Sequence, residues 1–370
     1  MPQTILITGG AGFIGRHLAR VLIERGDRVR VLDSLIDQVH GGAGRPEELH
    51  PDAELIIGDV RDESAVLSAV KGVDKVAHLA AEVGVGQSMY AVDRYTSVND
   101  HGTAVLFQQL IAHPVKRVVT ASSMSVYGEG LYQTQDGDLR QNVVRGARNP
   151  DGSWDPVDES GRALIPAPTP ETKQPALMSV YAIGKYVQER LTLTVAPAYG
   201  MQGVALRLWN VYGPGQALSN PYTGVLAIFA SRLANEQRPM VFEDGQQRRD
   251  FVHVADVARA FVLSLDRPDV DGHVFNIGSG EARTIEDVAR LQARSMGREH
   301  LTPDITQKAR IGDIRHCIPD LSKARDSLGF RPQQDFTEGV AELSEWVARQ
   351  EAADRVLEAR SELEARGLVA

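Results

Sequence analysis

The sequence predicts an α/β protein: a Rossmann-type, doubly wound parallel sheet followed by a smaller, mainly α-helical C-terminal substrate domain. Three observations predict this fold. Short β-branched runs alternate with helix-like segments over residues 1–120, a glycine-rich loop joins the first strand to the first helix, and helical patterns dominate after Gly280. Strands that alternate with helices indicate a parallel sheet that is covered on both faces.

The expected strands are short runs of apolar and β-branched residues, at Ile5–Thr8, Arg28–Leu32, Glu54–Ile57, Lys75–Leu79 and Arg117–Thr120. Apolar residues at helical spacing lie between several of these strands, at Ile14–Arg25, Glu63–Val70 and Thr103–Ala112. Two more helices are expected in the C-terminal part, at Thr284–Met296 and over Phe336–Arg366 with a break near Gln350.

Residues 130–175 interrupt this alternation. They contain Gln135-Asp136-Gly137-Asp138 and Pro150-Asp151-Gly152, together with Pro166, Pro168, Pro170 and Pro175, all of which favour turns and loops. A long irregular stretch inside a compact domain is often functional. We expect a loop-rich insertion, and two interpretations stay open: a solvated excursion, or a lid over the substrate.

The composition is that of a globular protein and argues against several partners. Of 370 residues, 42% are hydrophobic, and 40 basic against 49 acidic residues give a formal net charge of −9. This acidic balance does not favour nucleic acid, and no apolar run approaches the roughly 20 residues of a membrane span. The start, MPQTILITGG, lacks a secretory signal pattern, and the single Cys317 permits no internal disulfide. We therefore expect a cytoplasmic protein. The ten histidines include no HxxxH or HxH pair, so no metal site is expected.

The segment GGAGFIG follows the first strand and opens the first helix. Gly9, Gly12 and Gly15 give a GxxGxxG spacing, a variant of the dinucleotide-binding fingerprint. The first glycine permits a tight turn, the second lets the backbone approach a pyrophosphate, and the third lets the helix pack on the strand. N–H groups at the helix start, around Phe13 and Ile14, can receive the phosphate charge.

Asp33 lies at the end of the second strand. A carboxylate there can bind the 2′ and 3′ hydroxyls of an adenosine ribose and would repel a 2′-phosphate, so we expect NAD rather than NADP. Asp59 and Val60 follow another strand and are candidates for contact with the adenine ring.

Tyr181 and Lys185, in the segment YAIGK, lie about one turn apart on the same face of an expected helix. A free phenol has a pKa near ~10, too high for a base at neutral pH. A nearby ammonium and a positively charged nicotinamide both favour the phenolate and lower that pKa. Ser123, just after the strand Arg117–Thr120, can donate to a substrate oxygen and orient it toward Tyr181. These three residues are the predicted catalytic group.

In combination, these motifs resemble the extended short-chain dehydrogenases that modify nucleotide sugars. The likeness extends from the glycine loop to about Trp346 and includes Asp33, HLAA at 78–81, Asn99, SSMSVYG, YAIGK, RLWNVYGP, RRDFVHV and NIGSG. It implies that Tyr181 is the catalytic base, that Lys185 binds the nicotinamide ribose, and that Ser123 assists. It also implies cofactor contacts at Leu79, Ala80, Ala81 and Asn99, and substrate contacts at Ser123, Ser125, Asn210, Arg249, Arg310 and Arg315.

The family contains several activities, and two positions after Ser123 discriminate among them. Dehydratases of the family carry Asp-Glu there, whereas this chain has Met124 and Ser125, and neither can act as a strong acid or base at neutral pH. Decarboxylases of the family usually keep a Glu where Ser125 stands. Asp33 disfavours an NADPH-dependent reductase. A 4-epimerase that works through a transient 4-keto intermediate fits what remains.

Further segments resemble a subgroup described as dTDP-L-rhamnose 4-epimerases: QVHG at 38–41, GVGQSMY at 84–90 and QALSNPYTGV at 216–225. The expected substrate is therefore a nucleotide-diphosphate sugar, in particular a dTDP-6-deoxyhexose. A UDP-hexose or UDP-hexuronate 4-epimerase, a 4,6-dehydratase and a non-catalytic NAD-binding sensor stay open as alternatives.

Three parts are expected along the chain. Residues 1–206 would form the NAD-binding domain, and residues 207–350 mainly the substrate-binding domain, with 250–275 returning to the first domain. Residues 351–370 would form a charged helical tail. The likeness also implies a homodimer, formed through the helices Asn99–Ala112 and Tyr181–Pro197.

Overall fold

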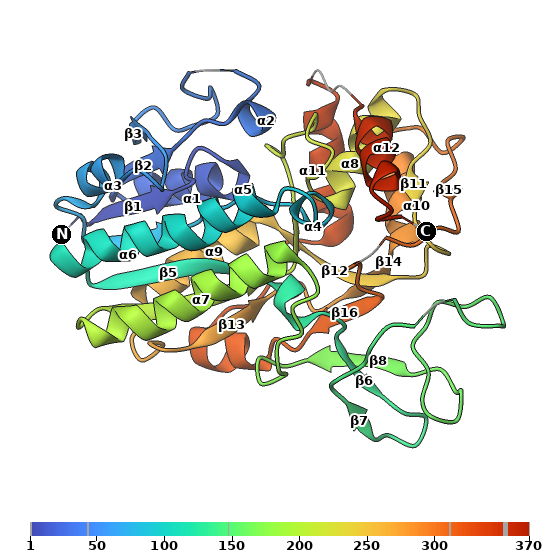
Figure 1. The fold of residues 1–370 in the computed structure, drawn as a ribbon. Coiled ribbons are helices and arrows are strands. Elements are labelled where there is room, and N and C mark those ends of the chain that lie inside the picture. Colours follow the sequence, from blue (N-terminus) through green and yellow to red (C-terminus); the bar gives the residue numbers. More distant parts are fainter. Residues whose placement is uncertain (1, 43, 147, 311, 351–353, 370) are drawn as a thin grey trace.

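The structure is a computed structural model, and it describes residues 2–42, 44–146, 148–310, 312–350 and 354–369. Its centre is a seven-stranded sheet in the order β13-β9-β5-β4-β1-β2-β3, in which all neighbouring strands are parallel (Figure 1). The strands are β1 Thr4–Thr8, β2 Arg28–Asp33, β3 Glu54–Ile57, β4 Lys75–His78, β5 Arg117–Ser123, β9 Gln202–Leu208 and β13 Val274–Ile277. The predicted parallel sheet is confirmed.

Helices cover both faces of this sheet. α1 and α9 pack together on one face, and α3, α6 and α7 lie on the other, toward the viewer in Figure 1. Their bounds are α1 Phe13–Glu24, α3 Glu63–Val70, α6 Gly102–Ala112, α7 Val180–Ala198 and α9 Val254–Asp266. Side chains of β1 alternate between the two layers: Ile5 and Ile7 belong to one apolar cluster and Leu6 to the other. Both faces of β1 are therefore buried, as a parallel sheet requires.

Short helical segments line the carboxyl ends of the strands. They are α2 Asp37–His40, α4 Val85–Ser88, α5 Val92–Thr96, the π-helical turn η1 Ser97–His101 and the 3₁₀ turn η2 Met124–Tyr127. Single π turns inside helical stretches often occur at functional sites. Here η1 places Asn99 next to the loop that follows β4.

A second sheet is mixed and has the strand order β10-β12-β16-β8-β6-β7, with β14 antiparallel to β12. It combines strands of the region 130–175 with strands of the C-terminal half. Its strands are β6 Leu131–Gln133, β7 Leu139–Arg140, β8 Ile165–Thr169, β10 Asn210–Tyr212, β12 Arg248–His253, β14 Ala282–Thr284 and β16 His316–Pro319. Helices α8 Val225–Ala234, α10 Ile285–Ser295 and α11 Phe336–Val347 pack against one another over an apolar cluster of their own. The remaining elements of this half are β11 Met240–Val241, β15 Asp304–Ile305, the π turn η3 Ala324–Leu328 and α12 Val356–Ala365.

Residues 254–277 return to the first sheet, where α9 packs on α1 and β13 pairs with β9. The tail forms α12 within its described residues, and residues 351–353 lie outside them. No helix in the described ranges combines the length and the apolar character that crossing a membrane would require.

The region 130–175 contains more regular structure than its sequence indicates. β6, β7 and β8 extend the second sheet and project as a separate lobe in Figure 1. Prolines ordinarily argue against an internal strand, yet Pro166 and Pro168 both lie in β8 between β6 and β16. Because N–H groups of alternate residues point to the same edge of a strand, both missing donors fall on one edge. The other edge of β8 keeps its full set of donors.

Candidate active site

A cavity of about 1040 Å³ lies at the carboxyl ends of the central strands. Its wall contains the residues that directly follow β1, β2, β3, β4 and β9 and the last three residues of β5, together with a loop of the second half, residues 215–224. Trp346, Gln350 and Arg355 from the C-terminal segment complete the rim. Ligands of open α/β sheets bind at this edge.

The glycine loop has the geometry that a dinucleotide requires. Gly9 has a φ of +68°, and a Cβ there would lie 2.8 Å from the backbone N of Ala80. A Cβ on Gly15 would lie 2.5 Å from the Cα of Gly10, so only glycine lets α1 approach β1 this closely. At Gly12 a Cβ would meet only the oxygen of Gly9, at 3.3 Å, and Gly12 lines the cavity with Phe13 and Ile14. The missing side chain leaves the backbone open to a ligand.

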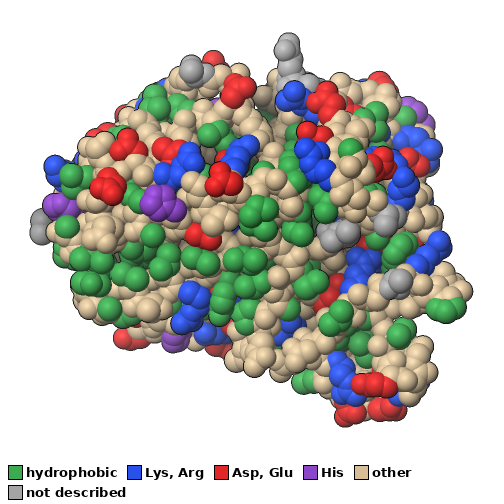
Figure 2. Space-filling view, viewed as in Figure 1, with side chains coloured by type: hydrophobic (Ala, Val, Ile, Leu, Met, Phe, Trp, Pro, Cys, Tyr) green, Lys and Arg blue, Asp and Glu red, His purple; other side chains and the backbone are tan. Residues whose placement is uncertain are grey.

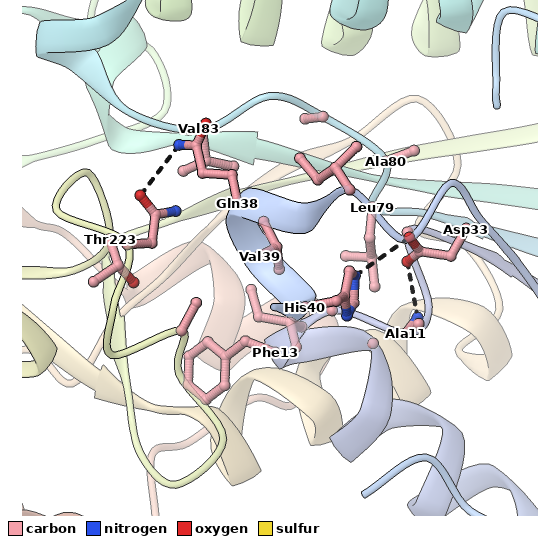
Figure 3. A pocket seen from close by; sticks show the side chains of 18 of the residues that line it. Ala11, Phe13, Asp33, Gln38, Val39, His40, Leu79, Ala80, Val83 and Thr223 are labelled. Carbon is pink, nitrogen blue, oxygen red and sulfur yellow. Dashed lines mark hydrogen bonds and ion pairs between the residues drawn. The ribbon is translucent and has the colours of Figure 1, made fainter. Parts of the chain in front are cut away.

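Asp33 is fixed at the end of β2 by three neighbours. Its Oδ2 accepts from the backbone N of Ala11 over 3.0 Å, and its Oδ1 accepts from the backbone N of Leu35 over 3.0 Å. His40 Nε2 lies 3.5 Å from the same Oδ1, and Figure 3 shows the contacts of Asp33 with Ala11 and His40. Asp33 lines the cavity and carries a carboxylate where a ribose diol would be bound.

The other predicted cofactor residues line the cavity, with the exception of Asn99. Asp59 and Val60 line it, as do residues 79–81. The pKa of Asp59 is held below its usual value, chiefly by the side-chain hydrogen bond from Arg61. Asn99 is fully buried and is not among the lining residues; its Oδ1 accepts from the backbone N of Glu82 over 2.7 Å and its Nδ2 donates to the Glu82 oxygen. Asn99 therefore holds the shape of the loop that begins with residues 79–81.

The predicted catalytic residues come together at one wall of the cavity. Ser123 from the end of β5 and Tyr181 and Lys185 from α7 all line it. Burial raises the pKa of Tyr181, and hydrogen bonding to the Ser123 hydroxyl, the smaller effect, lowers it. Burial also lowers the pKa of Lys185 to about 7. The pKa of the phenol is thus raised and that of the ammonium lowered, so the two values are shifted apart, and groups with such perturbed pKa values are typical of functional sites.

Most of the predicted substrate residues lie outside the cavity wall. Of the six, only Ser123 is a lining residue of the described cavity. The Ser125 hydroxyl donates to the Ser123 oxygen over 3.0 Å, and Asn210 Nδ2 donates to the backbone oxygen of Asp250 over 2.8 Å. Arg249 donates to the backbone oxygens of Arg248, Ile314 and Arg315. Arg310 is paired with Asp313 over 2.9 Å and stacks on Phe242.

Arg315 is paired with carboxylates of the protein instead of lining the cavity as the predicted substrate contact. It is 1% exposed, and its guanidinium contacts three carboxylates: Asp155 at 2.7 Å, Glu243 at 2.9 Å and Asp244 at 2.6 Å. Asp155 belongs to the insertion, so these ion pairs attach residues 130–175 to the second half. None of the described residues between 124 and 178 lines the cavity, so the lid interpretation has no support in this structure.

Glu82 lines the cavity, carries no motif and was missed by sequence reasoning. Glu82 is 7% exposed and is held by Arg94 through a bidentate contact of 2.8 and 2.7 Å. Arg94 also donates to Gln38, whose Nε2 donates to Asn220 in the loop of the second half (Figure 3 shows Gln38). Glu82 and Arg94 carry no sequence signal of their own, and the segments that contain Gln38 and Asn220 were noted only for their resemblance to a subgroup. Among the described residues, no group of three or more His, Cys, Asp or Glu side chains could hold a metal ion.

Comparison with known proteins places the chain in a family. The model of the NAD dependent epimerase/dehydratase family matches residues 5–150 and 160–278, so the chain belongs to this family and uses NAD. A dTDP-L-rhamnose 4-epimerase of Burkholderia thailandensis is 40% identical over 94% of this chain and 96% of its own length. A dTDP-glucose 4,6-dehydratase of Actinoplanes sp. is 30% identical over 92% and 97%. The crystal structure of UDP-glucose 4-epimerase from Thermotoga maritima with UDP-glucose has a TM-score of 0.76 at 32% identity, covering 94% of this chain and 99% of that one.

Proposed function

We propose that this chain is an NAD-dependent nucleotide-sugar 4-epimerase that acts on a dTDP-6-deoxyhexose such as dTDP-L-rhamnose. One observation carries the proposal: Ser123, Tyr181 and Lys185 line the same cavity, while the two positions after Ser123 hold Met124 and Ser125. A phenol base is thus present without the acid–base pair that eliminating water would need. The 40% identical relative, which is named dTDP-L-rhamnose 4-epimerase, supports the choice of sugar.

The chain's own residues fit NAD and a sugar hydroxyl in the same cavity. The glycine loop and Asp33 would hold the pyrophosphate and the adenosine ribose, and Lys185 would hold the nicotinamide ribose. Bound NAD would supply a hydride acceptor and donor at the sugar C4. Ser123 would donate to the C4 oxygen, and Tyr181 would take the hydroxyl proton and later return it. The 4-keto sugar would then turn within the cavity, so that the hydride returns to the other face of C4. Ser123 and Tyr181 would again contact the C4 oxygen, and Tyr181 would return the proton to it.

The UDP-sugar alternative has specific support. The structural relative from Thermotoga maritima contains UDP-glucose, and its fold matches over 94% of this chain. Dehydration is less favoured, because Met124 and Ser125 supply no acid or base even though a dehydratase is 30% identical. A non-catalytic sensor would not need the Ser123, Tyr181 and Lys185 group.

The deciding experiment incubates the purified protein, without added cofactor, with a panel of dTDP- and UDP-sugars in deuterated water and follows the products by proton NMR. We expect a C4 epimer that retains its C4 proton, because the hydride leaves and returns without exchanging with solvent. Accumulation of a 4-keto-6-deoxy sugar would instead identify a dehydratase. Absence of turnover with every sugar, although NAD is bound, would favour the sensor.

We also propose that the protein forms a homodimer through α6 and α7. These helices lie side by side on the sheet, and Figure 2 shows hydrophobic side chains gathered on this face of the molecule. On α7, Ile183 is 43% exposed, and Val187 and Leu191 follow at one-turn spacing with partial exposure. Light scattering of the wild type and of Ile183→Glu tests this assembly, and a monomeric wild type would contradict it.

A further inference from the structure

The ammonium of Lys185 belongs to a buried hydrogen-bonded chain. Its Nζ donates to the Oε1 of Gln188, one helical turn further along α7, over 2.6 Å. Both side chains are buried, with 3% of Lys185 and 0% of Gln188 exposed. Lys185 lines the cavity and Gln188 does not, so the amide contacts the ammonium from the protein side.

The NH₂ group of the Gln188 side chain fixes the orientation of the amide. Its Nε2 donates to the backbone oxygen of Ala80 over 3.0 Å and to the Oγ1 of Thr103 over 3.0 Å. The Thr103 hydroxyl already donates to the backbone oxygen of Asn99 over 2.6 Å, so it offers a lone pair to Gln188. A flipped amide would set its oxygen against the Ala80 oxygen and its NH₂ group against the ammonium. The carbonyl end is therefore held toward Lys185.

We propose that Gln188 is a positioning residue whose carbonyl oxygen holds the Lys185 ammonium at the cavity wall, in place to bind the cofactor ribose. An ammonium has three donors and no acceptor. Among the described residues Gln188 takes one donor, and the others remain for ligand groups in the cavity. The inference rests on the proposed function for the role of Lys185 toward NAD. Gln188 touches no reacting atom and acts through Lys185.

The contact also keeps the lysine charged. Burial lowers the pKa of Lys185 to about 7, whereas a carbonyl oxygen at hydrogen-bond distance favours the ammonium form. If that oxygen is removed, desolvation acts unopposed and the lysine loses its proton at a lower pH.

The neighbouring ionisable groups do not replace this oxygen. His78 of β4 contacts Gln188 and Thr103, and burial lowers its pKa to about 3, so it is neutral. Tyr181 shares the helix face of the ammonium, and burial raises its pKa. The Glu189 carboxylate is paired with an arginine of β9, and Asp100 of η1 lies against Gly184, where burial raises its pKa.

The test measures NAD binding to the full-length protein, by calorimetry, between about pH 6 and pH 9. In the wild type, affinity should fall as the pH rises through the pKa of Lys185, because the neutral amine is a weaker partner for ribose hydroxyls. Gln188→Met keeps the chain length and removes the oxygen, so the midpoint should move down by about one pH unit, with about threefold weaker binding halfway between the two midpoints and about tenfold weaker binding well above both. Gln188→Glu places a carboxylate beside the ammonium, so its midpoint should move up.

Opposite shifts in these two variants support the proposal, since a purely structural role would change both in the same direction. Shifts of the same sign, or an unchanged midpoint in a folded Gln188→Met protein, overturn it. If Gln188→Met does not fold, Thr103→Val replaces it: it releases the amide that Gln188 presents, and a smaller downward shift is expected. Gln334→Met, at an exposed glutamine, is the matched control. Because no sugar is present, the outcome is separate from the identity of the substrate.

Discussion

The carboxylate of Asp33 accepts a hydrogen bond from the backbone N of Ala11, with 3.0 Å between N and Oδ2. This bond joins the end of β2 to the glycine loop that follows β1. A carboxylate has about four acceptor sites, so Asp33 can hold the loop and still bind a ribose diol. The residue expected to select NAD therefore also shapes the loop expected to bind its pyrophosphate.

Asp33→Asn should weaken NAD binding by about 10- to 100-fold, because charge-assisted hydrogen bonds to the ribose would be lost. Discrimination against NADP should decrease in the same variant, since the repulsion of a 2′-phosphate is removed. Calorimetric titration with both nucleotides measures the two effects. Asp52→Asn, at an exposed carboxylate, is the control. An unchanged ratio of NAD to NADP affinity would exclude Asp33 as the selecting residue.

Tyr181→Phe should reduce turnover by about 10²- to 10⁴-fold, because the base that accepts the hydroxyl proton is removed. NAD binding should stay within a few fold of wild type, since the glycine loop and Asp33 are untouched. NMR of the product and calorimetry of NAD binding give the two values. Tyr199→Phe alters an exposed tyrosine at the end of α7 and should leave both unchanged. Near-normal turnover by Tyr181→Phe would assign the base elsewhere.

Ser123→Ala should move the rising limb of the pH profile of kcat/KM to higher pH. The hydrogen bond from Ser123 lowers the pKa of Tyr181, and burial raises it. Without Ser123, nothing opposes the increase of the Tyr181 pKa that burial causes. The phenolate should therefore form at a pH about one unit higher. The profile is measured with the sugar identified by NMR. Ser68→Ala, at an exposed serine of α3, is the control, and a limb that stays in place would show that Ser123 does not tune Tyr181.

Arg315→Met should lower the free energy of unfolding by about 3–5 kcal/mol, because it leaves buried carboxylates without their partner. Glu243, at 0% exposed, would be affected most. NAD affinity should not change, since none of these side chains lines the cavity. Urea unfolding followed by circular dichroism measures the loss, with the exposed Arg248→Met as control. A higher KM for the sugar at unchanged stability would instead support substrate binding by Arg315.

Acid pH should weaken the attachment of residues 130–175 to the second half, because Asp155 loses its charge when it is protonated. The pKa of Asp155 lies below its usual value, first because of the hydrogen bond from His316 and then because of Arg315. A carboxylate with a depressed pKa stabilises the fold above its unfolded-state pKa and loses that contribution as the pH falls through the folded value. The melting temperature of the wild type should therefore fall more steeply below about pH 4 than that of Asp155→Asn. Parallel curves for the two proteins would contradict this role.

Much of the cofactor side could be predicted because its signals are local. Glu63–Val70 was predicted with the observed bounds of α3, Thr103–Ala112 differs from α6 by one residue at its start, and Ile14–Arg25 differs from α1 by one residue at each end. The glycine pattern marks positions where a Cβ would collide, such as Gly15 against Gly10, and such constraints are visible in the sequence itself. The sequence indicated the role of Gln188 less clearly. Its only indication was its position one helical turn after Lys185, on the expected helix Tyr181–Pro197.

The substrate side could not be predicted equally well. Pro166 and Pro168 indicated a loop, but their alternate spacing lets β8 pair on both edges. The family resemblance implied a substrate contact at Arg315, whereas the structure pairs this arginine with Asp155 of the insertion, 160 residues away in the chain.

The sequence by itself determined the parallel sheet, the glycine loop and the residues Ser123, Tyr181 and Lys185, because strand periodicity, steric need for glycine and helical spacing act over a few residues. The tertiary structure decided which charges neutralise each other and which side chains reach the cavity. Ion pairs and buried amide contacts depend on distances between segments that only folding brings together, and the partners of Arg315 and Lys185 were set there.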